Sequence, residues 1–196
     1  MKAARHLLVA AAVLLAGSCA VPTNDEPVEL SGSIVPDTTT SSSTTSPETA
    51  TQEVFVYMIE QRDPGTVLRR VARSVEAGTG VQGRLNNLFT QRPRTDVDGE
   101  QGLISAIPES ATLLSASLDP NDPTLLIVDV RGLFGVEGPQ GATLRNALAQ
   151  IVWTATEGDP TLRVVFRQDG ERRPALVDNL ESTEDPVDRD DYQRNN

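Results

Sequence analysis

The side chains that could perform chemistry in this chain are mainly carboxylates, because the usual nucleophiles and bases are missing from most of it. His6 is the only histidine, Cys19 the only cysteine and Lys2 the only lysine. The rest of the chain therefore has no imidazole or thiolate metal ligands, no Ser-His-Asp or Cys-His arrangement and no amine for a Schiff base. It also has no P-loop or dinucleotide fingerprint. We expect no cofactor and no bound metal.

Paired carboxylates could still catalyse glycoside hydrolysis, in which one acid protonates the leaving group and the other acts as base or nucleophile. Two groups of acidic residues are candidates for such a pair: Asp96, Asp98 and Glu100, and Asp119, Asp122 and Asp129. The first group resembles a calcium loop but lacks the distant glutamate that completes one, so we expect a solvated loop. In the second group, turn formation explains the aspartates beside prolines. Asp129 ends an apolar strand, where hydrogen bonding to the next loop is favoured over catalysis.

Residues 1–18 have the features of a secretory signal peptide. Lys2 and Arg5 supply the positive charge, and the apolar run over residues 7–16 is too short to span a bilayer. The small residues before Cys19 resemble a bacterial lipobox, although alanine replaces the bulkier residue usually found three positions before the cysteine. We predict that Cys19 carries lipid and anchors the chain at the outer face of the cytoplasmic membrane. Cleavage by an ordinary signal peptidase is the alternative.

The chain after the signal peptide is strongly acidic. Loss of Lys2 and Arg5 would change the formal charge from -11 to -13, which disfavours nucleic acid and anionic lipid surfaces as partners. Residues 19–52 are rich in serine, threonine and proline, so we expect a disordered linker between the anchor and a folded domain. Whether this linker is glycosylated is left open.

Arginines are concentrated in one part of this acidic chain. Residues 53–94 hold seven arginines against four acidic residues. Arg69, Arg70 and Arg73 lie close together there and are candidates for a partner surface that binds an anionic wall polymer. Neutralisation of these arginines by the protein's own acids is the alternative.

The elements that must position these groups are organised around a helix predicted over residues 142–156. Its apolar residues recur at helical spacing and lie on one face, which must pack against a sheet. Trp153, the only tryptophan, falls on the opposite face. It is a candidate partner surface, because exposed aromatic residues are enriched at interface hot spots. The alternative is that the linker end or the helix predicted over residues 81–90 covers it.

Apolar runs and turn residues predict the other elements. We expect strands over residues 53–59, 111–118, 124–130 and 162–166, a second helix over 81–90, and an Asp-Gly turn at 169–170. Residues 66–76 fit either a helix or a strand. Residues 178–196 are acidic and nearly devoid of apolar groups, which predicts a disordered tail. The folded domain is then expected over residues 53–177, long enough for one core.

Two motifs are more specific than this general patterning: Gly-Leu-x-x-Ala-Ile-Pro at residues 102–108 and Ala-Gln-Ile-Val-Trp-Thr at residues 149–154. With the apolar runs around them, they resemble the GerMN domain, the sporulation and germination module of bacterial envelope proteins, here in an actinobacterial-type lipoprotein. The sequence departs from the family at residues 91–93, where the family usually has Gly-Pro. The resemblance implies that residues 68–75 form a strand, against their local periodicity.

Together these patterns predict an α/β (α+β) fold in a single small domain, with a mixed sheet of about four to five strands covered by two helices. With catalysis disfavoured, we expect a non-catalytic binding or assembly module of the cell envelope. Its expected partners are the membrane, through the lipid anchor, and an envelope protein or wall polymer. A carboxylate-dependent cell-wall glycan hydrolase is the alternative.

Overall fold

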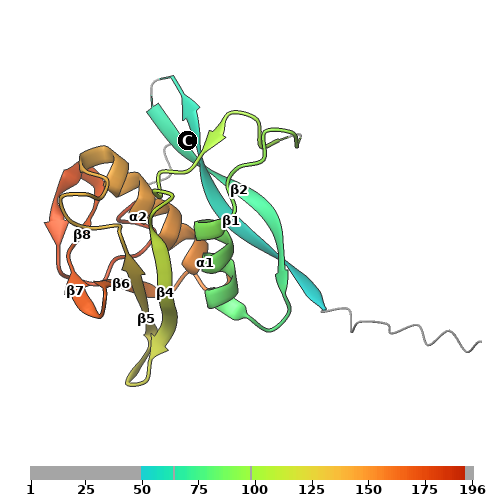
Figure 1. Ribbon diagram of the computed structural model, residues 1–196. Helices are drawn as coiled ribbons and strands as arrows, with labels where there is room; N and C mark the ends of the chain where they lie inside the picture. The colour runs from blue at the N-terminus through green and yellow to red at the C-terminus, as the bar shows by residue number, and fades with distance from the viewer. Residues whose placement is uncertain (1–49, 64, 98, 193–196) are drawn as a thin grey trace, which may run out of the picture. The chain divides into compact units, whose positions relative to one another are not determined.

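Three small sheets and two helices form the part of the chain that the computed structural model describes, residues 50–63, 65–97 and 99–192 (Figure 1). These residues fall within one unit, Thr45–Asn196, and they confirm the predicted α+β class. The predicted signal peptide, Cys19 and most of the predicted linker lie outside the described residues. Neither described helix is long and apolar enough to cross a membrane.

The first sheet is built on a long hairpin. β1 (Thr51–Arg62) and β2 (Gly65–Glu76) pair antiparallel over their whole length, and β3 (Leu103–Ile104) lies on the other side of β1. The β-branched and aromatic residues of β1 suit a pleated, buried strand, and the stretch from residue 56 to 59 is buried. β2 confirms the strand that the family resemblance implies. The apolar residues of β2 have helical spacing, but pairing with β1 outweighs this local preference.

The second sheet contains one parallel pair. Its strands, in spatial order, are β4 (Thr112–Asp119), β5 (Asp122–Arg131), β6 (Arg163–Gln168) and β7 (Glu171–Arg173). Parallel strands need a long crossover connection, and α2 (Gly141–Ala155) lies in the crossover between β5 and β6. Asp169 and Gly170 join β6 to β7 with positive φ angles of 54° and 85°, as the Asp-Gly motif predicts.

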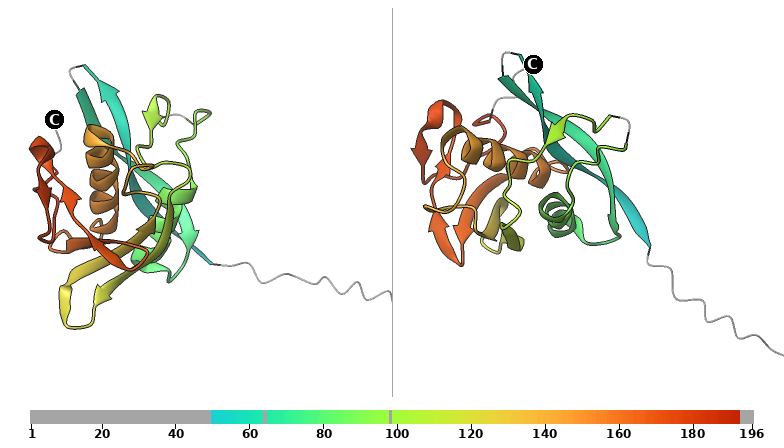
Figure 2. Two further views of the ribbon diagram at one scale, coloured as in Figure 1. Left: turned by 60° about the vertical axis from the view of Figure 1, so that its left-hand side comes forward. Right: turned by 45° about the horizontal axis from the view of Figure 1, so that its top comes forward.

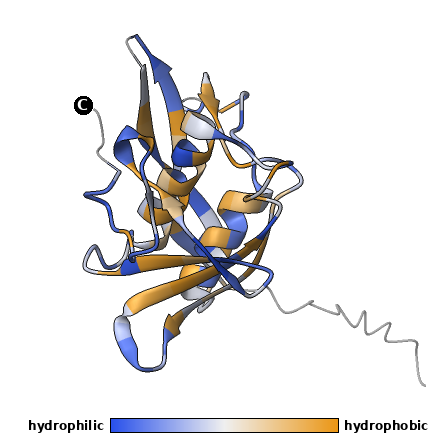
Figure 3. Cartoon of the chain, turned by 90° about the vertical axis from the view of Figure 1, so that its left-hand side faces the viewer, coloured by the Kyte–Doolittle hydropathy of each residue, from blue (hydrophilic) through white to orange (hydrophobic). Residues whose placement is uncertain are grey.

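α2 is buried around most of its circumference. Figures 1 and 2 show it with the β1–β2 hairpin on one side and strands β6 to β8 on the other. Its residues from Ala147 to Val152 are all buried, and Figure 3 shows hydrophobic colouring concentrated on the strands and this helix, with polar hairpin turns. The prediction of a single apolar face is therefore too narrow, since elements pack against the helix on more than one side.

Side chains of α2 explain why the strands form separate sheets where the sequence predicts one. The backbone N–H of Tyr57 in β1 donates to Thr154 Oγ1, and its carbonyl oxygen accepts from Gln150 Nε2, each over 2.9 Å. These bonds satisfy the backbone groups that a further strand would need. Among the described residues, no strand therefore pairs with Tyr57 on this side of β1, and β3 pairs only with Ile59 and Glu60.

The second helix, α1 (Gly80–Thr90), confirms the helix predicted over residues 81–90. Its buried residues Leu85, Leu88 and Phe89 belong to one hydrophobic core that also includes residues of the first and second sheets and of α2. α1 packs against β1, β2 and β4. It thereby forms one wall of a surface hollow beside β2.

The predicted disordered tail is wrong for residues 178–192. Two short elements lie within this region, η1 (Asp178–Leu180) and β9 (Ser182–Thr183), and β8 (Ala175–Leu176) lies just before it. β9 pairs with β8, and Val187 forms a bridge with Val164 of β6. Tyr192 is fully buried. The acidic composition of this segment conceals a few apolar anchors, because its charged groups stay at the surface while the anchors pack inward.

Candidate functional site

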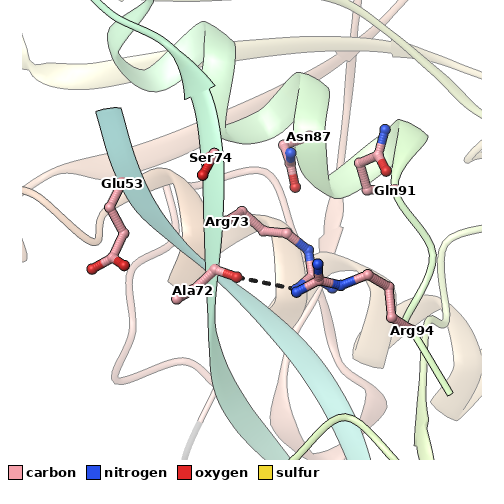
Figure 4. Close-up of a pocket in the computed structure, with 7 residues that line it drawn as sticks. All are labelled: Glu53, Ala72, Arg73, Ser74, Asn87, Gln91 and Arg94. Atoms are coloured by element: carbon pink, nitrogen blue, oxygen red, sulfur yellow. Dashed lines mark hydrogen bonds between the residues drawn. The ribbon is translucent and has the colours of Figure 1, made fainter. Parts of the chain in front are cut away.

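A polar hollow of about 360 Å³ lies between β2 and α1 (Figure 4). Its lining residues come from the hairpin, from α1 and from the loop after α1: Glu53, Ala72, Arg73, Ser74, Asn87, Gln91 and Arg94. Ala72 and Ser74 have small, exposed side chains, which leave the backbone of β2 accessible beside the hollow. This combination of open backbone and polar side chains makes the hollow the candidate binding site.

A buried ion-pair network supports one wall of the hollow. The two terminal nitrogens of Arg73 donate to the two carboxylate oxygens of Glu100 over 2.5 and 2.6 Å, and these residues are 7% and 3% exposed. Arg94 donates to the same carboxylate from its backbone N–H (2.7 Å) and from its guanidinium. Burial would raise the pKa of Glu100, but hydrogen bonds from both arginines lower it to about 2. Glu100 is therefore an ionised structural anchor.

Two buried polar atoms of the lining residues have no hydrogen-bond partner among the described residues. They are Nε of Arg73, a donor, and Oδ1 of Asn87, an acceptor. Native proteins leave few buried polar atoms unsatisfied, and such atoms call for a specific explanation. Here a donor and an acceptor on facing elements, β2 and α1, are both unmet beside the same hollow.

The outer edge of β2 is open along the hollow. Tyr57 pairs with Arg70 in the hairpin register, yet both backbone groups of Tyr57 bond to α2. The pair is therefore of the non-hydrogen-bonded type, and by alternation so are the pairs that contain Ala72 and Ser74. The backbone groups of Arg70, Ala72 and Ser74 thus point away from β1. No described strand lies on that side of β2.

The three arginines proposed as a partner surface are each paired with an acid of the chain. Arg69 bonds Glu60 over 3.2 Å. Arg70 bonds Glu157 over 2.6 Å, with its guanidinium 3.3 Å from the centre of the Phe55 ring. Arg73 is interior, so its assignment to an exposed surface is wrong. The arrangement matches the alternative in which the protein's own carboxylates neutralise this charge.

Trp153 is half-buried at the junction of α2, β1 and the C-terminal segment. Its ring centroid is 5.3 Å from that of Tyr57, and the guanidinium of Arg189 lies 4.6 Å from the indole centroid. Nε1 of Trp153 donates to the backbone oxygen of Tyr192 over 3.0 Å. Among the described residues, the C-terminal segment, predicted as a tail, therefore contributes to covering the indole.

Most of the candidate catalytic carboxylates support local structure. Asp119 and Asp122 accept backbone N–H bonds from residues two positions later, as turn formation predicts. Asp129 accepts from the N–H of Gly170 over 3.2 Å, which agrees with the expected bond to the next loop. The expectation of a solvated loop is wrong for Glu100, and Asp98 lies outside the described residues. No group of three or more potential metal ligands occurs among the described residues.

Sequence reasoning missed the hollow, although one signal was present. In α1, Asn87 lies between the buried residues Leu85 and Leu88 and is therefore close to the core. An amide at such a position requires a hydrogen-bond partner. The missing information was which element faces it, because β2 approaches α1 only through the tertiary fold.

Comparisons with known proteins identify a family and solved structures with a similar fold. A family model described as "Germane: Sporulation and spore germination" matches residues 21–174. The tandem GerMN domains of the sporulation protein GerM from Bacillus subtilis align at 19% identity and a TM-score of 0.50, over 72% of this chain and 45% of that one. This chain thus spans less than half of the tandem structure. The first GerMN domain of GerM aligns at 16% identity and a TM-score of 0.48, over 71% and 98% of the two chains.

A putative lipoprotein from Clostridium perfringens aligns at 16% identity and a TM-score of 0.40, over 72% of this chain and 89% of that one. A search of curated proteins found no match.

Proposed function

The chain belongs to the Germane family of sporulation and spore germination proteins, and from this premise we propose that it is a non-catalytic binding or assembly module of the cell envelope. In this proposal, lipid on Cys19 holds the chain at the outer face of the cytoplasmic membrane. The Ser/Thr/Pro-rich linker then gives the folded domain room to reach a partner.

The hollow between β2 and α1 is the observation that carries this proposal. It places an open strand edge, half-exposed Arg94 and two unmet buried polar atoms in one location. Such features favour recognition of another molecule, because binding can supply partners that the fold itself does not. The carboxylates around the fold support the same interpretation, since Glu100 and Asp129 are engaged in hydrogen bonds that hold loops in place.

Photo-crosslinking in intact cells tests the binding function directly. A photoreactive residue replaces Gln91, which lines the hollow, in the full-length protein. A matched variant carries it at Gln61, an exposed residue near the tip of the β1–β2 hairpin. We expect a discrete crosslinked species from position 91 and none from position 61. Absence of any crosslink at position 91 would count against the hollow as a binding site.

The anchor has its own test. Cys19→Ala should move the protein from the membrane to the soluble fraction, and mass spectrometry of the wild type should find a lipid-modified Cys19. An unmodified mature N-terminus at another residue would overturn the lipid anchor while leaving the binding function open to the crosslinking test.

A further inference from the structure

Resting on the proposed binding function, we infer that the free edge of β2 takes up an extended peptide of a partner protein as an added strand. We further infer that a neutral amide side chain of this peptide, glutamine or asparagine, enters the hollow. The first part follows from the backbone of β2 and the second from the chemistry of the lining.

The backbone groups of β2 offer the pattern that an added strand requires. Arg70, Ala72 and Ser74 direct their N–H and C=O groups away from β1, spaced two residues apart. In strand addition, such groups bind the backbone of an extended peptide, and neighbouring pockets select its alternate side chains. One outward carbonyl, that of Ala72, accepts a 3.1 Å bond from the guanidinium of Arg73, which leaves its second lone pair available.

β2 is only partly protected at this point, because the Arg73 guanidinium bonds the Ala72 carbonyl but no proline or bulge interrupts the strand. Proteins commonly block free edges with prolines, bulges, charged side chains or a covering helix. The hairpin register is continuous through residues 70–74. Ala72 and Ser74 are small, and Arg70 is held away by Glu157 and the Phe55 ring. The edge is therefore accessible where the hollow begins.

The charges around the hollow favour a neutral ligand side chain. Arg73 and Arg94 are matched by Glu53 and Glu100 among the lining residues and their ion-pair partners. A carboxylate or an ammonium group entering the hollow would upset this balance and lose its hydration.

An amide offers separate atoms for the two unmet hydrogen-bonding groups, whereas an apolar side chain offers none. The amide oxygen can accept from Arg73 Nε, and the amide nitrogen can donate to Asn87 Oδ1. Arg73 Nε and Asn87 Oδ1 are buried below the surface of the hollow. The half-exposed Arg94 side chain must therefore shift when the amide enters.

Acetamido groups of wall glycans present the same donor and acceptor as a side-chain amide. A glycan, however, has no repeating backbone N–H and C=O groups to pair with β2. The open edge therefore favours a peptide, and glycan binding becomes one outcome of the test.

The probe is a phage-displayed library of random linear nonapeptides, selected on the purified full-length chain in detergent. We expect selected peptides to share a glutamine or asparagine and to bind with micromolar affinity or better. N-methylation of successive residues in the best synthetic peptide should weaken binding at every second position, by about tenfold per lost hydrogen bond. This alternating pattern is specific to strand pairing and leaves the protein unchanged. Failure to select binders, or loss at consecutive positions, would overturn the inference.

Protein variants locate the interaction. Ala72→Pro removes an outward N–H on an edge strand, where proline is tolerated, and should weaken peptide binding about tenfold. Asn87→Leu should abolish the preference for glutamine over glutamate in the peptide. Asn86→Leu, on the exposed side of the same helix, should change neither. Competition by a chitin oligosaccharide that is unaffected by Ala72→Pro would instead indicate glycan binding and overturn the peptide.

These results separate the inference from the function on which it rests. A crosslinked partner at position 91 that Ala72→Pro does not weaken would retain the binding module and refute strand addition. Absence of both the crosslink and selected peptides would refute both.

Discussion

The side-chain amide of Gln150 joins three elements by bonding to two backbone groups from distant parts of the chain. Its nitrogen donates to the carbonyl oxygen of Tyr57 in β1 over 2.9 Å, and its oxygen accepts from the N–H of Ala106 over 2.7 Å. Gln150 is completely buried. One glutamine on α2 thus completes the hydrogen bonding of the β1 edge and of the loop after β3.

Gln150→Leu should destabilise the fold substantially, because it leaves two buried backbone groups without partners. Each unsatisfied group costs about 1–3 kcal/mol, so we expect the free energy of unfolding to fall by about 3 kcal/mol in urea titration. Gln61→Leu, at an exposed position of β1, is the matched control and should stay within about 0.5 kcal/mol of the wild type. Equal effects of the two substitutions would contradict the assigned role.

This relationship shows what the sequence could and could not predict. The motif Ala-Gln-Ile-Val-Trp-Thr was recognisable, and helical periodicity located α2 correctly. The reason for the motif was not accessible, because Gln150, Trp153 and Thr154 all meet Tyr57, almost a hundred residues earlier. Local patterns report spacing along one element, whereas these contacts depend on how two elements cross.

The C-terminal segment and the Asp-Gly turn show the same contrast. The turn at Asp169 and Gly170 was predictable because the residues themselves favour positive φ angles. The packing of residues 178–192 was not, since it depends on Val187 and Tyr192 finding sites on other elements. The acidic composition predicted the surface of this segment but not the burial of Val187 and Tyr192.

Acid should weaken the fold through Glu100. Its pKa is about 2 in the folded protein against an ordinary value of 4.5 for glutamate, so the ionised form stabilises the fold above about pH 4.5. This contribution, about 3 kcal/mol, should be lost as the pH falls from 4.5 towards 2. Glu100→Gln should therefore be destabilised by a similar amount at pH 7, and its difference from the wild type should shrink in this range. We would measure unfolding free energies by urea titration at several pH values.

The control for acid sensitivity is Glu109→Gln. The Glu109 side chain is 91% exposed and approaches Arg92 only to 4.0 Å, so its removal should leave the pH profile of stability unchanged. A wild-type profile that stays flat between pH 5 and 3 would refute the role of Glu100.

Internal pairing of the arginines predicts weak binding of anionic polymers. Glu157 accepts from Arg70 and from Arg189, over 2.6 and 3.3 Å, so Glu157→Gln should release positive charge on one face of the fold. We expect the variant to retain more of an inorganic polyphosphate probe than the wild type at low salt, with the difference vanishing at high salt. Strong, salt-sensitive binding by the wild type would show instead that free arginines remain. Asp159→Asn, a nearby turn residue that bonds Thr161, tests whether loss of any negative charge suffices.

Fluorescence of Trp153 reports the docking of the C-terminal segment. The indole contacts Arg189 and Tyr192, so the wild type should show blue-shifted emission and resist acrylamide. Deletion of residues 186–196 removes both contacts and should shift the emission to the red and raise quenching, while circular dichroism retains most of the helical signal. Deletion of residues 193–196 alone should leave the spectrum unchanged, because it spares both contacts. If the longer deletion also left emission and quenching unchanged, the segment would not cover the indole in solution, and the α2 face around Trp153 would again be a candidate partner surface.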